Sequence, residues 1–219
     1  MRLRADGVET RKRILSAACE VFAARGYTQA TVAAICRRAG ANSAAINYHF
    51  KDKESLYVEV WRSLAAEAMR LYPLHGGVAS NAPARERLRG FVLSLLQRMT
   101  DRGRLGAFHR LRTLEMASPT GLMDRVRWEL VRPMREYIRQ ILVELLGDEV
   151  GEQEIRFCEL NLVGPCVLAQ LTCQQPGRMP APALFQPGEV QAFAAHCAEF
   201  VIAGLESVRA RQETSRVAS

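Results

Sequence analysis

Hydrophobic residues recur along this chain at intervals of three and four, and no alternating run with hairpin turn residues accompanies them. This spacing is the period of amphipathic α-helices, so it predicts an all-α fold of about nine helices. The expected helices cover residues 10–25, 32–39, 43–49, 53–71, 85–100, 105–117, 122–146, 152–173 and 187–211. Pro133 is expected to interrupt the seventh helix, and a segment from 174 to 187 with four prolines interrupts the pattern before the last.

The composition fits a folded chain with its own core. Apolar residues make up 48% and charged residues 24% of the 219 residues, and no stretch approaches the roughly 18 consecutive apolar residues of a membrane span. The N-terminus lacks the apolar segment of a secretion signal, so we expect a cytoplasmic protein with no membrane partner. The six cysteines form no C-x-x-C pairs, and we interpret them as buried apolar residues, with no metal site and no cofactor.

Basic residues are concentrated near the N-terminus. The net charge is +7, and residues 1–56 hold ten Lys or Arg against five Asp or Glu. This asymmetry fits a polyanionic partner for the first segment and a nearly neutral body behind it. A solvated basic face would give the same charge, so charge alone does not decide between the two.

Two short predicted helices, 32–39 and 43–49, are joined by Gly40, which permits a sharp turn. Thr31 and Asn42 are suitable N-caps for them. The second helix presents short or polar side chains that let it enter a major groove and touch base edges, namely Ser43, Ala44, Asn47 and Tyr48. The pattern predicts a helix-turn-helix, although short helices with a glycine turn also occur in purely structural bundles.

Several N-terminal motifs resemble the opening of TetR-family regulators. They are residues 10–18 (TRKRILSAA), 21–27 (VFAARGY), 35–40 (ICRRAG), 48–50 (YHF) and 53–56 (KESL). The resemblance implies a helix-turn-helix DNA-binding domain at 1–53 and a helical effector-binding and dimerisation domain at 54–219. It also implies a ligand-responsive repressor that binds an inverted-repeat DNA operator as a homodimer.

The resemblance further implies DNA contacts for single residues. Phosphate contacts are expected from Thr31, Tyr48, His49 and Lys53, and base contacts from Ser43, Ala44 and Ala45, beside the capping residue Asn42. The family usually has tyrosine at the position of Asn47, whereas asparagine can pair with adenine through two hydrogen bonds. Whether Asn47 meets a base, a phosphate or only its neighbours stays open, and packing at the helix end is the alternative role for His49.

The rest of the chain resembles the branch of the family with a CerR-type C-terminal domain, through residues 44–50 (AAINYHF), 115–120 (EMASPT), Pro133 and 157–165 (FCELNLVGP). This part is expected to bind a small apolar or amphipathic effector in a concave apolar cavity. The candidate pocket has apolar walls and two polar anchors: Trp61, Phe91, Phe108, Met116, Met123 and Trp128, with Arg112 and Glu115. Each aromatic residue also fits a core position, and the two anchors also fit a surface i,i+3 pair.

The last predicted helix is apolar on two sides, and the segment 155–171 is apolar almost all round. Helices with two apolar faces need two partners, so we expect both to pair with their copies in a symmetric four-helix interface. The candidate interface residues are Cys166, Phe193, Cys197, Val201 and Leu205, with Phe200 and Ile202 on another side of the last helix. Burial of that helix within a monomer is the alternative.

Two other classes of function fit less well. The four histidines are scattered, and neither a G-x-S-x-G elbow nor a phosphate-binding glycine loop is present, so we do not expect an enzyme. A helical scaffold that binds only proteins would leave the basic segment solvated. Specific, salt-dependent binding to an inverted repeat separates a repressor from such a scaffold.

Overall fold

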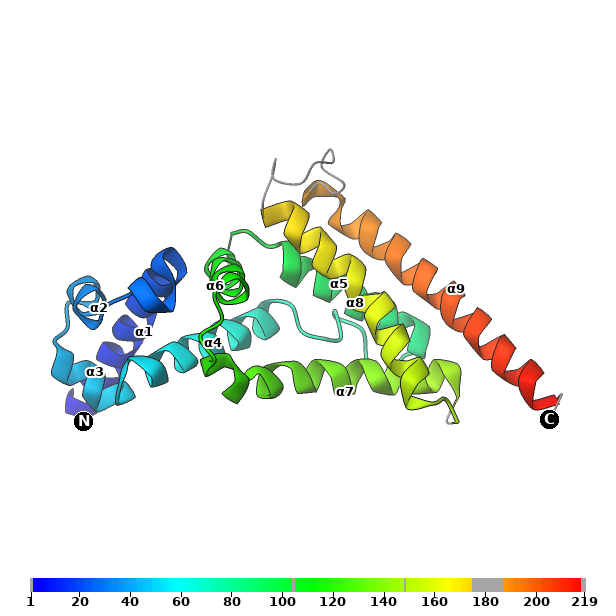
Figure 1. Cartoon of the computed structure of the whole chain (residues 1–219), viewed down its shortest axis with the longest axis horizontal. Helices are drawn as coiled ribbons and strands as arrows, with labels where there is room; N and C mark the ends of the chain where they lie inside the picture. The colour runs from blue at the N-terminus through cyan, green and yellow to red at the C-terminus, as the bar shows by residue number, and fades with distance from the viewer. Residues whose placement is uncertain (1, 104, 148, 175–186, 218–219) are drawn as a thin grey trace. The chain divides into compact units, whose positions relative to one another are not determined.

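The computed structural model of the chain describes residues 2–103, 105–147, 149–174 and 187–217. These residues form nine α-helices and two short 3-10 helices and contain no strand, which confirms the all-α fold (Figure 1). The elements are α1 (Arg2–Gln29), α2 (Val32–Ala39), α3 (Ser43–Phe50), α4 (Lys53–Leu71), α5 (Ala84–Thr100), α6 (Gly106–Ala117), η1 (Leu122–Arg125), α7 (Arg127–Leu146), α8 (Glu152–Gln174), η2 (Pro187–Glu189) and α9 (Val190–Val217).

The first helix starts earlier than the hydrophobic pattern predicts. It begins at Arg2 rather than near residue 10, and Thr10 lies inside it with its Oγ1 donating to the Asp6 carbonyl at 2.8 Å. The added turns are mostly polar, so they leave no apolar period in the sequence. Gly26 breaks the helix as predicted, with φ 70° and ψ 175°.

The expected interruption at Pro133 is wrong. α7 runs through this residue, and the break lies at Val126, between η1 and α7. Proline cannot donate to the carbonyl of Glu129, but both residues are exposed and water can satisfy that oxygen. The predicted proline-rich interruption at 174–187 falls largely on residues 175–186, which lie outside the described residues.

Contacts within the chain define two units, residues 1–67 with 102–130 and residues 68–101 with 131–219. The predicted domain boundary at residue 53 lies inside the first unit, because α6 packs against α1. The core of this unit joins side chains from α1 to α4 with side chains from α6 and η1, including Phe22, Ile46, Leu56, Leu111 and Met123. The helix-turn-helix is therefore supported by chain segments well beyond it in the sequence.

In the second unit, α5 packs against both α8 and α9. Its core includes Phe91, Leu95, Leu162 and Ala198. The loop after α4 packs closely on α5, since a Cβ atom on Gly76 would lie 2.0 Å from the carbonyl oxygen of Gly90. Ser94 Oγ also makes hydrogen bonds to the carbonyls of Tyr72 at 3.0 Å and Pro73 at 2.6 Å. Close backbone approach and a buried hydroxyl thus hold this loop on the helix.

Candidate nucleic-acid interface

The turn between α2 and α3 has the predicted caps. Thr31 Oγ1 accepts from the Ala34 N–H at 3.1 Å, and Asn42 Oδ1 accepts from the Ala45 N–H at 2.9 Å. Gly40 ends α2 in the left-handed conformation, with φ 59° and ψ 41°, where a side chain would be strained. Local hydrogen bonds therefore fix where each helix begins and the angle at which α3 leaves α2.

α3 has one buried and one exposed face. Ile46 and Phe50 are buried in the core of the first unit. The opposite face carries the side chains that the sequence predicts to be exposed: Ser43, Ala44, Asn47 and Tyr48, the last with 85% of its surface accessible. This face is polar and of low relief apart from Tyr48, which suits a helix that enters a major groove.

The remaining predicted contact residues of α3 are half-buried. Ala45 packs against the core, and the ring of His49 lies 4.9 Å from that of Tyr48 and 6.3 Å from that of Phe50 between centroids. These ring contacts fit the packing role of His49. DNA contacts by any of these residues stay predictions.

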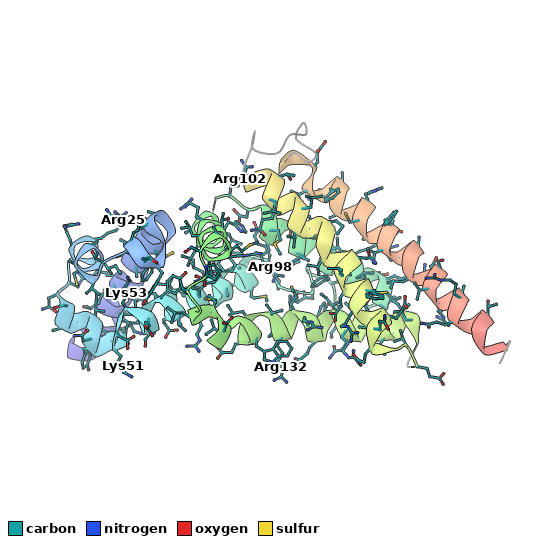
Figure 2. The ribbon with its side chains drawn as sticks, viewed as in Figure 1. Arg25, Lys51, Lys53, Arg98, Arg102 and Arg132 are labelled. Atoms are coloured by element: carbon teal, nitrogen blue, oxygen red, sulfur yellow. The ribbon has the colours of Figure 1, made fainter. Side chains whose placement is uncertain are left out.

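α4 begins at a capped turn beside α3. Asp52 Oδ1 accepts from the Ser55 N–H at 2.7 Å. The Lys53 ammonium lies 4.2 Å from the ring centroid of Tyr27, and burial lowers the pKa of Lys53 (Figure 2). A cation–π contact therefore orients the lysine for which the family resemblance predicts a phosphate contact.

The two predicted polar anchors of the effector pocket have different surroundings. Glu115 accepts from the Tyr57 hydroxyl at 2.8 Å and from both the N–H and Oγ1 of Thr120 at 2.9 Å. It joins α6 to α4 and to the segment before η1, a role that the sequence did not indicate. Arg112 is half-buried, and this burial lowers its pKa.

The predicted pocket walls do not share one environment. Trp61, Phe108 and Met123 lie in or against the core of the first unit, where a distance of 5.6 Å separates the ring centroids of Trp61 and Phe108. Phe91 lies in the core of the second unit. Met116 and Trp128 have 67% and 57% of their surface exposed. The structure thus groups three of the walls, and an effector pocket built from all of them stays a prediction.

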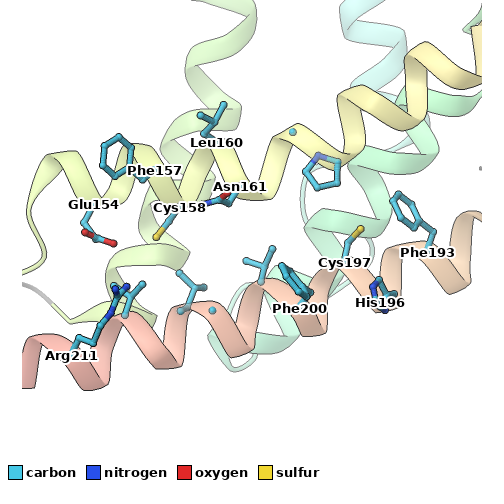
Figure 3. A pocket seen from close by; sticks show the side chains of 16 residues that line it. Glu154, Phe157, Cys158, Leu160, Asn161, Phe193, His196, Cys197, Phe200 and Arg211 are labelled. Carbon is cyan, nitrogen blue, oxygen red and sulfur yellow. The ribbon is translucent and has the colours of Figure 1, made fainter. Parts of the chain in front are cut away.

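A groove of about 800 Å³ runs between α8 and α9 in the second unit (Figure 3). Buried side chains that line it include Cys158, Cys197, Val201 and Leu205. Beside them stand exposed apolar side chains, with 70% of Leu160 and 75% of Phe200 accessible. The predicted interface residues Phe193, Cys197, Val201 and Leu205 line this groove.

Cys166, the remaining predicted interface residue, is fully buried in the core of the second unit, where burial raises the pKa of its thiol to about 12. The sequence predicts that α8 is apolar almost all round, but of its residues only Cys166 was assigned to the interface, and the exposed apolar stripe was not. Four exposed side chains form this stripe, with the half-buried Gly164 in the middle, and a spacing of three or four residues could have revealed it: Phe157, Leu160, Leu168 and Leu171. α8 therefore has an apolar face that the described residues of its own unit leave uncovered.

Among the described residues, no group of three or more His, Cys, Asp or Glu side chains is placed to hold a metal ion. Within the same residues, no helix has the length and apolar character needed to cross a membrane. All six cysteines are free, four of them buried and two half-buried.

A capped helix-turn-helix with an exposed polar second helix defines a class of DNA-binding proteins. Residues 14–60 match the model of the family described as bacterial regulatory proteins, tetR family. Residues 84–205 match the C-terminal domain of the HTH-type transcriptional dual regulator CecR, the domain expected from the sequence as CerR-type. The chain belongs to the TetR family of transcriptional regulators and carries a CecR-type C-terminal domain. It is thus a DNA-binding regulator and not an enzyme.

Relatives match over different lengths. CecR from Shigella flexneri is 26% identical over 182 residues, which cover 75% of this chain and 77% of CecR. The HTH-type transcriptional regulator SrpR from Pseudomonas putida is 41% identical over 70 residues, which cover 32% of this chain and 30% of SrpR.

Solved structures share the fold at low identity. FadR from Bacillus subtilis, solved in complex with stearoyl-CoA, superposes with a TM-score of 0.65 at 19% identity, over 88% of this chain and 98% of FadR. A regulatory protein of the tetR family from Rhodococcus RHA1 gives a TM-score of 0.62 at 17% identity, over 88% of this chain and 95% of that protein.

Proposed function

We propose that this chain is a cytoplasmic repressor that binds an inverted-repeat operator as a homodimer and leaves it when a small apolar or amphipathic effector binds. The exposed polar face of α3, held between capped helices, carries the proposal. One chain has one recognition helix and reads one half-site. Two copies related by a twofold axis match an operator with inverted symmetry.

The groove between α8 and α9 is the surface that we assign to the second copy. Exposed apolar side chains line it, among them Phe157, Leu160 and Phe200, and an exposed apolar patch of this kind marks an interface. At one end of the groove, Glu154 of α8 and Arg211 of α9 present opposite charges (Figure 3). An apolar strip with charges of both signs at its end is suited to pairing with its own copy.

The effector proposal draws on the family and on one shared fold. FadR from Bacillus subtilis was solved with stearoyl-CoA, a long amphipathic ligand. Acyl-CoA thioesters and free fatty acids are therefore the first probes to use. CecR is described as a dual regulator, so the transcription assay must be able to detect activation as well as repression.

Selection of duplexes from a random pool tests this function. We expect a single inverted repeat to be enriched, to reduce transcription when placed at a promoter in the presence of the protein, and to be released by one of the amphipathic probes. Enrichment of no sequence at physiological salt would favour the protein-binding scaffold. Increased transcription would contradict the repressor assignment and leave DNA binding intact.

A further inference from the structure

Lys51, between α3 and α4, has a backbone conformation that residues other than glycine rarely adopt. Its φ is 73° and its ψ is −56°, and it is the only non-glycine residue with positive φ in the described part of the chain. Its N–H donates to the Asn47 carbonyl at 3.0 Å, and the Asp52 N–H donates to the Phe50 carbonyl at 2.9 Å. These bonds close a tight γ-turn centred on Lys51.

This turn joins two fixed helices. α3 ends at Phe50, α4 begins at Lys53, and the side chain of Asp52 caps α4. A strained backbone persists only where its surroundings determine it, and such positions concentrate at functional sites. Glycine would adopt this conformation more easily, so the presence of lysine needs another reason.

The side chain of Lys51 supplies that reason. It is exposed, and in the described residues it takes part in no ion pair, side-chain hydrogen bond or ring contact. Lys53, two residues later, is half-buried with its ammonium over Tyr27. Figure 2 shows Lys51 near the junction of α3 and α4, well away from Arg25 in the later part of α1. Of the two lysines at this turn, Lys51 is the more exposed, and its ammonium has no partner among the described residues.

We propose that Lys51 contacts DNA and neutralises a backbone phosphate beside the C-terminal end of the recognition helix, with the strained turn fixing the direction of its side chain. The inference rests on the proposed operator binding and adds a contact that the motif did not indicate. Lysine–phosphate pairs position a protein on the duplex and supply the salt-dependent, sequence-independent part of its affinity.

Three substitutions separate charge from strain. Lys51→Gln removes the charge and keeps the strained turn, Lys51→Arg keeps both, and Lys51→Gly removes both. Arg25→Gln is the matched control, because Arg25 is an exposed cation of the same unit placed away from the turn. The full-length variants are titrated on the selected operator and on a scrambled duplex, between about 50 and 200 mM salt.

We expect Lys51→Gln to weaken binding to both duplexes by a similar factor, roughly threefold to tenfold at the lowest salt. The slope of log affinity against log salt should fall by about 1 for each protomer bound. Lys51→Arg and Arg25→Gln should bind like wild type. Lys51→Gly should bind as weakly as Lys51→Gln while unfolding at a higher temperature, because glycine relieves the strain.

Wild-type affinity and slope in Lys51→Gln would overturn the inference and leave the proposed function standing. A loss confined to the operator would also overturn it, since that is the signature of a base contact. If Lys51→Arg were as weak as Lys51→Gln, charge would not be the cause. Failure of the wild-type protein to bind any selected duplex would reject the proposed function and this inference together.

Discussion

Single residues decide how closely segments of this fold approach one another. Gly76 and Gly77 both have positive φ, at 56° and 84°. They differ in their surroundings, because a Cβ on Gly76 would meet the carbonyl of Gly90 at 2.0 Å while nothing lies within 4 Å of one on Gly77. A side chain at Gly77 would therefore meet backbone strain alone, whereas a side chain at Gly76 would meet the same strain and a steric clash.

Alanine at Gly77 should destabilise the protein by about 1 to 2 kcal/mol, the cost of a left-handed backbone for a residue with a side chain. Alanine at Gly76 should cost at least about 1 to 3 kcal/mol more, because the loop must also move away from α5. Urea unfolding of both variants measures the difference. Equal losses would mean that the loop shifts freely and that the close approach does not contribute to stability.

The predicted DNA contacts divide into phosphate and base contacts, and binding data distinguish the two. Lys53→Ala should weaken operator and scrambled duplexes similarly and lower the salt slope by about 1 for each protomer. Ser43→Ala and Asn47→Ala should cost about 1 to 3 kcal/mol on the operator and little on scrambled DNA. An operator-specific loss for Lys53→Ala, together with a similar loss on both duplexes for Ser43→Ala and Asn47→Ala, would show that α3 enters the groove in another orientation.

At the scale of elements, the sequence predicts helices better than their ends and faces. Periodicity locates α2, α3 and α4 closely because each has a cap or a glycine stop at its boundaries. It misses the start of α1 and mistakes Pro133 for a break. The start of α1 consists of mostly polar turns, and at Pro133 water can satisfy the one carbonyl that loses its hydrogen bond. Neither feature appears in the spacing of apolar residues.

Which face of a helix is buried in its own unit is harder still to predict from the sequence. α9 is apolar on two sides, and only the packing of α5 and α8 shows which side is inside its own unit. The interface residues predicted from the sequence are therefore largely the buried side, whereas Phe200 is on the exposed side. The predicted pocket walls share one environment only in part for the same reason, since their environments depend on how distant helices pack.

The difference between the buried and the exposed face of α9 decides which substitution tests the proposed dimer. Phe200→Glu places a charge on an exposed position and should give a folded monomer, because two carboxylates cannot be buried unpaired at a twofold interface. Val201→Glu places the same charge at a position that is only 8% exposed in one chain, and should destabilise the fold itself by about 3 to 5 kcal/mol.

Light scattering after size exclusion and thermal unfolding by circular dichroism separate the two outcomes. Phe200→Glu should have half the wild-type mass and retain its helical signal, whereas Val201→Glu should show a large drop in unfolding temperature. A dimeric Phe200→Glu variant would place the interface on another surface of the chain.

At the scale of the whole molecule, the proposed function has two copies of the chain bind one operator at once. Each half-site interaction gains from the other because the second contact becomes intramolecular. The Phe200→Glu monomer should therefore lose most operator affinity although its α3 is unchanged. Because both half-sites must be bound together, we expect an effector to act by changing the distance between the two recognition helices.

Recognition helices read successive major grooves when they lie one DNA turn apart, about 34 to 36 Å, or a multiple of it. An effector that binds a dimer with another spacing more tightly shifts the population by that difference in affinity, typically about 1 to 3 kcal/mol. We therefore expect saturating amphipathic ligand to weaken operator binding by roughly 5- to 150-fold. Linkage requires the operator to weaken ligand binding by the same factor, so both titrations should be measured on the same protein. A ligand that binds tightly in the presence and absence of operator, with one affinity, would show that it is not the effector.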